Sequence, residues 1–433
     1  NYIQYMFYGC SSLTSLYLNN NFNTLYVKNM SNLFSLCKIL TSIDVSKFNT
    51  NNVIDMNSMF KNCETLKKLD IGKFVASKVK DMAHIFDSCF NLESISINSS
   101  NFHTSSVENM EYMFSNCKKL KSMDLSKFDT SQVKNMRNMF ESCEILTSLD
   151  VSNFITSKVI NMEYMFYNCR KIKNINVNNL VTPSVTDISY MFSLCLSLTS
   201  LNLDNFDTSK VKNMYRSFCE CSSLISLNLY NFDTSQVTCM RSMFYGCSSL
   251  ISLNVSNFNT TKVNWINHIF YKCSSLVSLD LSSFNTSKFT DTRSMFEGCL
   301  SLTSLNLPNF DTSKVTWIHD IFKSCENLEY INLKNYDESS LKNLNNIFDK
   351  VPENIVICLN ITKNVTQMYS QLSKKKCYVL DCSDDWKSKQ KKIINETAEC
   401  IDECGKNTEY KYEYNGKCYK NCSNGFIEDE SNN

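Results

Sequence analysis

Cysteine is the residue type in this sequence with the clearest capacity for chemistry. The chain has 433 residues, of which 22 are Cys. Thirteen of them recur every 26 residues, except for steps of 27 after Cys10 and 28 after Cys89. This ladder comprises Cys10, Cys37, Cys63, Cys89, Cys117, Cys143, Cys169, Cys195, Cys221, Cys247, Cys273, Cys299 and Cys325.

Three roles are open to the ladder: metal ligands, disulfides, or small buried apolar thiols. Stacked coils about 5 Å apart lie within the Cα range that a disulfide tolerates. Equivalent side chains point the same way, however, so disulfides would form only in pairs and under strain. We therefore expect free thiols that close each coil. Cys219 and Cys239 lie off the ladder and are expected either to pair or to stay free.

No other residue pattern predicts catalysis or a cofactor. None of the four His residues lies in a Cys/His cluster with ligand spacing, and no Gly-x-Ser-x-Gly, P-loop or His-Glu-x-x-His motif occurs. The 44 Lys and Arg residues balance 43 Asp and Glu residues, giving a net charge of +1. This balance argues against a nucleic-acid or anionic-membrane partner. No apolar run reaches the roughly 18 residues of a membrane-spanning helix.

The elements that position these residues follow from one repeated unit. Its clearest copy is CSSLISLNLYNFDTSQVTCMRSMFYGC, from Cys221 to Cys247. A repeat of this length with Leu at fixed positions is typical of a solenoid. Leu227 to Tyr230 alternates apolar and polar residues, which predicts a short strand. Stacked coils would join these strands into a parallel sheet.

The second half of the unit predicts a short helix. Apolar residues from Met240 to Cys247 are spaced i, i+3, i+4 and i+7. Most repeats place Asn or Asp just before this stretch, where a side-chain oxygen can cap a helix. Asp233-Thr234-Ser235 supplies the turn between strand and helix. We predict an α/β solenoid, leucine-rich-repeat-like, with one short parallel strand and one short helix in each of about 13 coils.

The repeat divides the chain into three predicted parts. The solenoid covers residues 1–350, a capping turn and linker covers 351–373, and a Cys-rich, disulfide-bonded module covers 374–433. Asn1 falls in the middle of a repeat and no initiator Met is present, so we expect further chain upstream, which could include a secretion signal.

The outward positions of the strands form the candidate ligand-binding face. Seven coils from residue 118 to residue 299 place Asp or Asn seven residues after the ladder Cys, and one of them adds a Tyr two residues further on. Short hydrogen-bonding groups in a row suit a polar ligand, either protein or glycan. A solvated face without a partner is the alternative, and neighbouring Asp pairs also leave a weak calcium site open. The candidates are Asp124, Asp150, Asn176, Asn202, Asn228, Tyr230, Asn254 and Asp280.

The C-terminal cysteines are candidates for disulfides. Cys400-x3-Cys404 and Cys418-x3-Cys422 could bind zinc, but x2 spacing is usual for zinc and a disulfide framework fits a secreted chain better. Tyr414 to Lys417 predicts a hairpin turn between the two pairs. We therefore predict nested disulfides, Cys400–Cys422 and Cys404–Cys418. Cys358, Cys377 and Cys382 remain, an odd number.

Several Asn-x-Ser/Thr sequences are possible glycosylation acceptors if a eukaryote secretes the protein. The chain is rich in Asn, Ser and Thr, so many such sequences arise by chance. Those outside the regular array are our candidates: Asn360, Asn364 and Asn395.

The repeat resembles the BspA-type leucine-rich-repeat surface proteins, including the repeats first catalogued in mycoplasma lipoproteins. The motifs MFYGCSSL, SLNL and NFDTSQV, which carry the resemblance, recur in order over about residues 1–350. The resemblance implies a solenoid on a secreted or cell-surface protein, associated with adhesion and with binding of host or matrix proteins. It brings no catalytic residues and no cofactor.

We therefore expect a non-enzymatic extracellular or cell-surface protein that binds a protein or glycan. Two alternatives stay open. The solenoid could be a structural spacer, or it could be a targeting module for a domain missing from this sequence.

Overall fold

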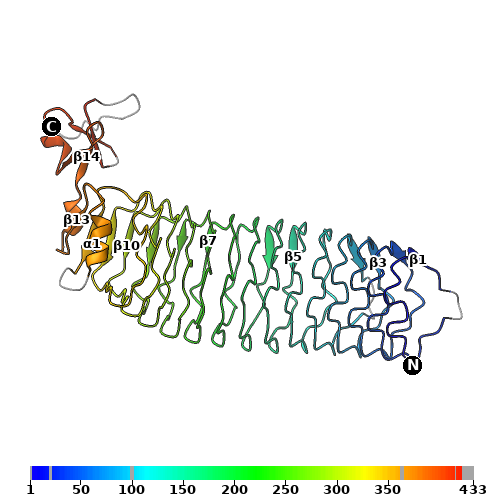
Figure 1. Ribbon diagram of the computed structural model, residues 1–433. Helices are drawn as coiled ribbons and strands as arrows, with labels where there is room; N and C mark the ends of the chain where they lie inside the picture. The colour runs from blue at the N-terminus through cyan, green and yellow to red at the C-terminus, as the bar shows by residue number, and fades with distance from the viewer. Residues whose placement is uncertain (1, 19–21, 98–101, 361–364, 415, 422–433) are drawn as a thin grey trace.

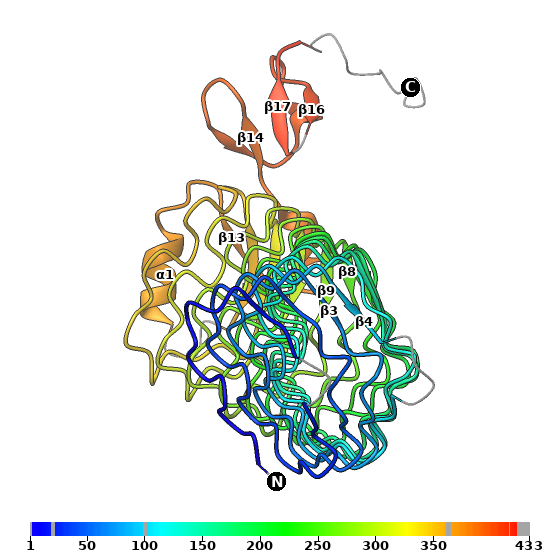
Figure 2. The same ribbon diagram turned by 90° about the vertical axis from the view of Figure 1, so that its right-hand side faces the viewer.

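The structure is a computed structural model, which describes residues 2–18, 22–97, 102–360, 365–414 and 416–421. The chain winds into an elongated stack of coils with the N-terminus at one end and a small C-terminal module at the other (Figure 1). Seen from the end, the coils lie one behind another and are progressively offset, so the stack is not straight (Figure 2). The predicted solenoid of stacked parallel strands is confirmed, although the coils that begin at Cys117 and Cys195 carry no assigned strand, and the number of coils approximately matches the prediction.

Short parallel strands line one side of the stack. They pair in register one repeat apart, so Leu305 of β10 lies opposite Leu279 of β9 and Ile331 of β11. The bounds are β1 Ser15–Leu16, β2 Ser42–Ile43, β3 Lys68–Asp70, β4 Ser94–Ser96, β5 Ser148–Asp150, β6 Asn174–Asn176, β7 Ser226–Leu227, β8 Ser252–Leu253, β9 Ser278–Asp280, β10 Ser304–Asn306, β11 Tyr330–Leu333, β12 Val356–Leu359 and β13 Val379–Leu380. β7 to β13 form one seven-stranded sheet.

The predicted helix in each coil is wrong. Among the described residues of the repeats, Met240–Cys247 and its equivalents are consecutive turns, and α1 (Thr366–Leu372) follows only after the last repeat. Met243 N–H bonds within the coil to Met240 O at 3.2 Å, whereas Phe244 N–H bonds to Ile269 O of the next coil at 3.0 Å. Alternate amides thus hold neighbouring coils together, which a helix would prevent by using every amide internally.

These turns need left-handed backbone at two positions per coil. In the repeat from Cys221, Ser242 has φ 55° and Gly246 has φ 72°. Positive φ is uncommon outside Gly and belongs at the third position of a type II turn. The turns bury Met240, Met243, Phe244 and Cys247 completely. They therefore give the same apolar spacing as a helix, which is why the sequence pattern indicated one.

The Asn and Asp residues predicted as helix caps have another role. Each forms an isolated parallel bridge to its equivalent one coil away, as Asn135 does with Asn161. The side-chain oxygen still accepts the amide two residues on, for example from Arg137 to Asn135 at 3.1 Å. This local hydrogen bond is the one expected of Asn and Asp, but it stabilises a turn and does not cap a helix.

Two further columns fill the interior. The repeat Phe residues stack from Phe7 to Phe348, with ring centroids 5.2 to 6.1 Å apart. The buried Thr of the Asp-Thr-Ser turn joins coils through its hydroxyl. Thr234 Oγ1 donates to Asn259 O at 3.0 Å and accepts Asn259 N–H at 2.7 Å.

The C-terminal module is a separate small sheet beside the end of the stack (Figure 1). It contains η1 Trp386–Lys389, β14 Lys392–Ile394, β15 Cys400–Ile401, η2 Cys404–Lys406, β16 Tyr412–Tyr414 and β17 Lys417–Tyr419. The strands pair in the order β15-β14-β17-β16. Their core is small: Ile394, Cys404, Tyr410 and Cys418 are its buried residues.

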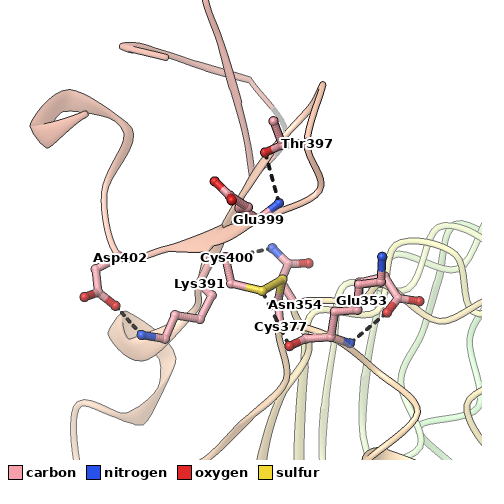
Figure 3. Close-up of a disulfide and its surroundings, with 9 residues drawn as sticks. Glu353, Asn354, Cys377, Lys391, Thr397, Glu399, Cys400 and Asp402 are labelled. Atoms are coloured by element: carbon pink, nitrogen blue, oxygen red, sulfur yellow. Dashed lines mark hydrogen bonds and ion pairs between the residues drawn. A yellow bond between two sulfur atoms is a disulfide. The ribbon is translucent and has the colours of Figure 1, made fainter. Parts of the chain in front are cut away.

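The predicted disulfide pairing is half right. Cys404–Cys418 is confirmed, but Cys400 pairs with Cys377 and not with Cys422, which lies outside the described residues. Cys358 pairs with Cys382. Figure 3 shows Cys377–Cys400 linking the end of the stack to the module, next to a hydrogen bond from Asn354 Nδ2 to Lys391 O at 2.9 Å. The prediction failed because it paired Cys400 within the last part of the tail, whereas its partner Cys377 lies just before β13, the last strand of the stack.

Candidate binding surface

The predicted strand face is a row of exposed polar side chains on adjacent coils. Asn176 is half-buried, and the other seven candidate residues are exposed. Tyr230 is 70% exposed. β5 and β6 place Asp150 directly opposite Asn176. The structure thus brings the candidates into one row, with neighbours one coil apart.

Each member of the row is fixed by the same local hydrogen bond. The side-chain oxygen accepts the amide two residues further along the chain, at 2.9 to 3.4 Å. Tyr230 supplies that amide to Asn228. Hydrogen bonds from Ser126 and Ser152 also hold the pKa values of Asp124 and Asp150 below their ordinary values. The carboxylates are therefore ionised at neutral pH, and the side chains are oriented before any ligand arrives.

The row is connected across coils in places. Asn228 Nδ2 donates to Asp204 Oδ1 at 3.2 Å, and Asn332 Nδ2 donates to Asn306 Oδ1 at 2.9 Å. Each of these hydrogen bonds joins the polar side chains of two adjacent coils. Among the described residues, no group of three or more His, Cys, Asp or Glu side chains is placed to hold a metal ion. The suggested calcium site gains no support from this geometry.

The ladder cysteines contribute structure rather than an accessible site. From Cys37 to Cys325 they are buried and free, and the two off-ladder residues Cys219 and Cys239 are also free. Each buried ladder thiol bonds to a carbonyl of the preceding coil, as Cys247 Sγ does to Phe218 O at 3.1 Å. Burial raises the pKa of these thiols, to about 12 for Cys299. The prediction of buried free thiols is confirmed for the described coils after Cys10, which is exposed.

The histidines do not form a shared site. His84 Nδ1 lies 2.9 Å from Asp87 Oδ2, and His319 Nδ1 lies 2.7 Å from Asp320 Oδ2. His268 is half-buried beside Tyr271. His84 also stacks on Tyr112 of the next coil, with ring centroids 4.7 Å apart, and no two of these three rings contact each other.

The glycosylation candidates stay predictions. Asn395 is exposed at the end of β14, and Asn360 is half-buried after β12. Asn364 lies outside the described residues. No described helix has the length and apolar character needed to cross a bilayer.

The sequence analysis missed one group of surface residues. Tyr and Arg side chains from five adjacent coils meet on the turn segment that precedes the ladder Cys. Their signal was visible, since Tyr recurs at equivalent positions in Tyr164 and Tyr190, and again in Tyr245 and Tyr271. A helix over this segment, as the apolar spacing predicts, would direct these side chains differently, so their contacts between coils do not follow from the sequence pattern.

Comparison with known proteins identifies the repeats. The family described as "Mycoplasma protein of unknown function, DUF285" matches residues 1–102, 88–200, 186–305 and 277–386. The chain belongs to this family. The DUF285 match confirms the resemblance to BspA-type repeats that the sequence motifs predicted.

Solved structures similar to this DUF285 chain are repeat proteins. A leucine-rich repeat protein from Bacteroides ovatus is 20% identical over 73% of this chain and 87% of its own, with a TM-score of 0.41. A leucine rich cell surface protein from Faecalibacterium prausnitzii is 18% identical over 79% and 75%, with a TM-score of 0.28. The InlJ functional domain from Listeria monocytogenes, which includes a cysteine ladder, is 15% identical over 80% and 69%, with a TM-score of 0.22.

No curated protein matches the chain.

Proposed function

We propose that this protein is a secreted or cell-surface binding protein whose strand face contacts an extracellular protein or glycan. The observation that carries the proposal is the row from Asp124 to Asp280, in which each exposed side chain is fixed by a hydrogen bond from the amide two residues on. Groups held in place before binding lose less conformational entropy when a ligand arrives.

The three disulfides support an extracellular location, because such bonds persist in oxidising compartments. The family assignment agrees with a binding role, since BspA-type repeats are associated with surface proteins. We propose no catalytic activity and no cofactor.

The test is binding of the full chain to an array of extracellular proteins and glycans. A triple variant, Asn202→Ala, Asn228→Ala and Asn254→Ala, removes three adjacent members of the row. We expect specific, saturable binding that falls at least tenfold in this variant, because each coil contributes polar contacts to the same ligand. A matched control changes Asn51, Asn52 and Asp233 to Ala on the turn between strand and bridge.

The outcomes separate the alternatives. Binding that survives the triple variant would move the ligand site away from the strand face. A folded protein that binds nothing on the array would favour a structural spacer. Both interpretations require that the circular dichroism spectrum of the variant matches that of the wild type, which shows that the variant is folded.

A further inference from the structure

A second surface, distinct from the strand face, is built from tyrosine and arginine. It lies on the turn segments of five adjacent coils. Aromatic contacts run along it without a break from Tyr164 to Tyr215, and resume from Tyr245 to Tyr271. The Tyr–Arg surface comprises Tyr164, Tyr167, Tyr190, Tyr215, Arg216, Arg241, Tyr245 and Tyr271.

Arg216 joins the two aromatic runs. Its guanidinium carbon lies 5.8 Å from the ring centroid of Tyr190, 5.5 Å from that of Tyr215 and 6.0 Å from that of Tyr245. Arg241 lies one coil further on, and its guanidinium carbon is 5.6 Å from the Tyr215 centroid. The backbones of the two arginines are directly bonded, Arg216 N–H to Arg241 O at 3.1 Å. Two cations are thus held side by side among aromatic rings.

Neither arginine has a carboxylate partner among the described residues. Arg137 and Arg293, by contrast, form ion pairs with Glu163 and Asp291 at 2.8 and 2.7 Å. The Arg216 Nε atom is buried and has no hydrogen-bond partner in the described part of the chain. A buried N–H group without an acceptor is costly, because its hydrogen bond to water is lost and not replaced.

The acidic residues nearby do not cancel this charge. Asp187 accepts hydrogen bonds from Asn213 Nδ2 and Ser189 N–H. The Glu220 carboxylate packs against Gly246, 2.8 to 3.0 Å from where a Cβ would stand. Lys272, over the Tyr271 ring at 5.2 Å, adds a further cation. The hydrogen bonds to Asp187 come from neutral donors, so Asp187 keeps its charge, and the three cations Arg216, Arg241 and Lys272 outnumber the two carboxylates of Asp187 and Glu220.

In the coils on either side of the Tyr–Arg surface, the charged side chains form ion pairs with one another. Toward the N-terminus, Arg137 is paired with Glu111 and Glu163 at 3.6 and 2.8 Å. Toward the C-terminus, Lys323 is paired with Glu297 and Asp320 at 3.0 and 3.3 Å. The unpaired cations are confined to the coils between, together with the densest group of tyrosines. Charge complementarity therefore favours an acidic partner at this place.

The residue types indicate what kind of partner fits. Tyr and Arg are enriched among the residues that dominate protein–protein binding energy. An arginine fork binds a carboxylate through two parallel hydrogen bonds. Five coils at about 4.8 Å spacing span roughly 19 Å, which matches about six residues of extended chain.

We propose that the Tyr–Arg surface is a docking site for an acidic, extended segment of a partner protein. Arg216 and Arg241 bind two carboxylates on the same side of that segment, two residues apart. The tyrosines pack against its intervening side chains and backbone. This proposal is independent of the strand face.

The test uses a phage-displayed library of 12-residue peptides panned on the full chain. We expect selected peptides to carry Asp or Glu at positions i and i+2. Their affinity should fall at least tenfold for the double variant Arg216→Gln/Arg241→Gln. The variant Arg216→Lys keeps the charge but loses the planar guanidinium, so its affinity for the peptides should lie between those of the wild type and the double variant.

The matched control is Lys210→Gln/Lys212→Gln, which removes the same charge from exposed positions on an adjoining part of the coil. Its affinity should equal the wild type. The strand-face triple variant should also bind the peptides normally, which separates failure of this proposal from failure of the proposed function.

Three results would overturn the proposal. The selected peptides could lack acidic residues, they could bind the double variant equally well, or panning could return nothing above background. Retention on heparin that is lost in the double variant, without any peptide selected, would instead assign the surface to a sulfated glycan.

Discussion

The repeat array and the C-terminal module use cysteine in opposite ways. In the array the thiols from Cys37 to Cys325 are free, buried and bonded to carbonyls of the preceding coil. At the C-terminal end, six cysteines form three disulfides. The difference follows from how each region buries apolar surface.

Each coil of the array is covered by its two neighbours. The core is continuous from Val27 to Leu372 and includes the stacked Phe column. A thiol inside such a core only needs to be small and apolar. The module has four buried residues in its own cluster, and two of them, Cys404 and Cys418, are joined to each other. Small cores of this kind usually depend on cross-links.

The first prediction separates the two regions by reduction. Treatment with a phosphine reductant at neutral pH should unfold the module and leave the array intact, because removing a native disulfide from a small domain typically costs about 2–5 kcal/mol. Limited trypsin digestion with mass spectrometry should show new cleavage at the lysines of the module, from Lys387 onward, with none in the repeats.

The double variant Cys404→Ala/Cys418→Ala should give the same cleavage without reductant, while Cys247→Ala should not. Equal digestion of repeats and module after reduction would show that the array also depends on cross-links.

The second prediction tests what replaces cross-links in the array. Thr234→Val keeps the shape of the side chain but removes the hydroxyl that donates to Asn259 O and accepts Asn259 N–H. Two part-buried hydrogen bonds between adjacent coils are lost, so we expect a decrease of about 1–3 kcal/mol in the free energy of unfolding. Denaturant titration followed by circular dichroism measures it.

The control is Thr261→Val, an exposed residue whose hydroxyl bonds only to Asn259 Oδ1 at 2.7 Å. Its effect should lie within about 0.5 kcal/mol. Equal losses for the two variants would mean that the buried Thr column does not link the coils.

The sequence predicted what depends on spacing alone. Leu227 and Phe244 recur at fixed positions, so the coil length, the parallel strands and the buried thiols could all be derived from the repeat. The exposed row that contains Asn228 follows from the alternation of buried and exposed side chains along a strand. The DUF285 family match rests on the same regularity.

What failed depends on how backbone amides are shared. The stretch from Met240 to Cys247 has helical spacing, but half of its amides bond to the next coil, and a sequence pattern does not show the partner. Likewise, Cys400 pairs with Cys377 because the last coils lie beside the module. The Tyr–Arg surface needed both the turn geometry and the coil-to-coil distance before Arg216 could be placed among three rings.

The last prediction uses pH to confirm that the array thiols are buried and protonated. Burial raises the pKa of Cys247 well above its ordinary value, whereas in the unfolded chain it should be about 8.5. Above that value the unfolded state loses a proton that the folded state keeps, so the thiol's contribution to stability is complete at pH 7.5 and falls as pH rises. One pH unit above the unfolded pKa, this loss is about 1.4 kcal/mol for each such thiol.

Cys247→Ala isolates one thiol from the others. The variant is expected to be less stable than the wild type at pH 7.5, because a cavity replaces the sulfur, but the gap should narrow by about 1.4 kcal/mol at pH 9.5. Denaturant titrations of the variant and the wild type at the two pH values measure this gap in the free energy of unfolding. A gap for Cys247→Ala that stays constant would mean that its thiol reaches solvent in the folded protein, and the contrast between a sealed array and a cross-linked module would then fail at that coil.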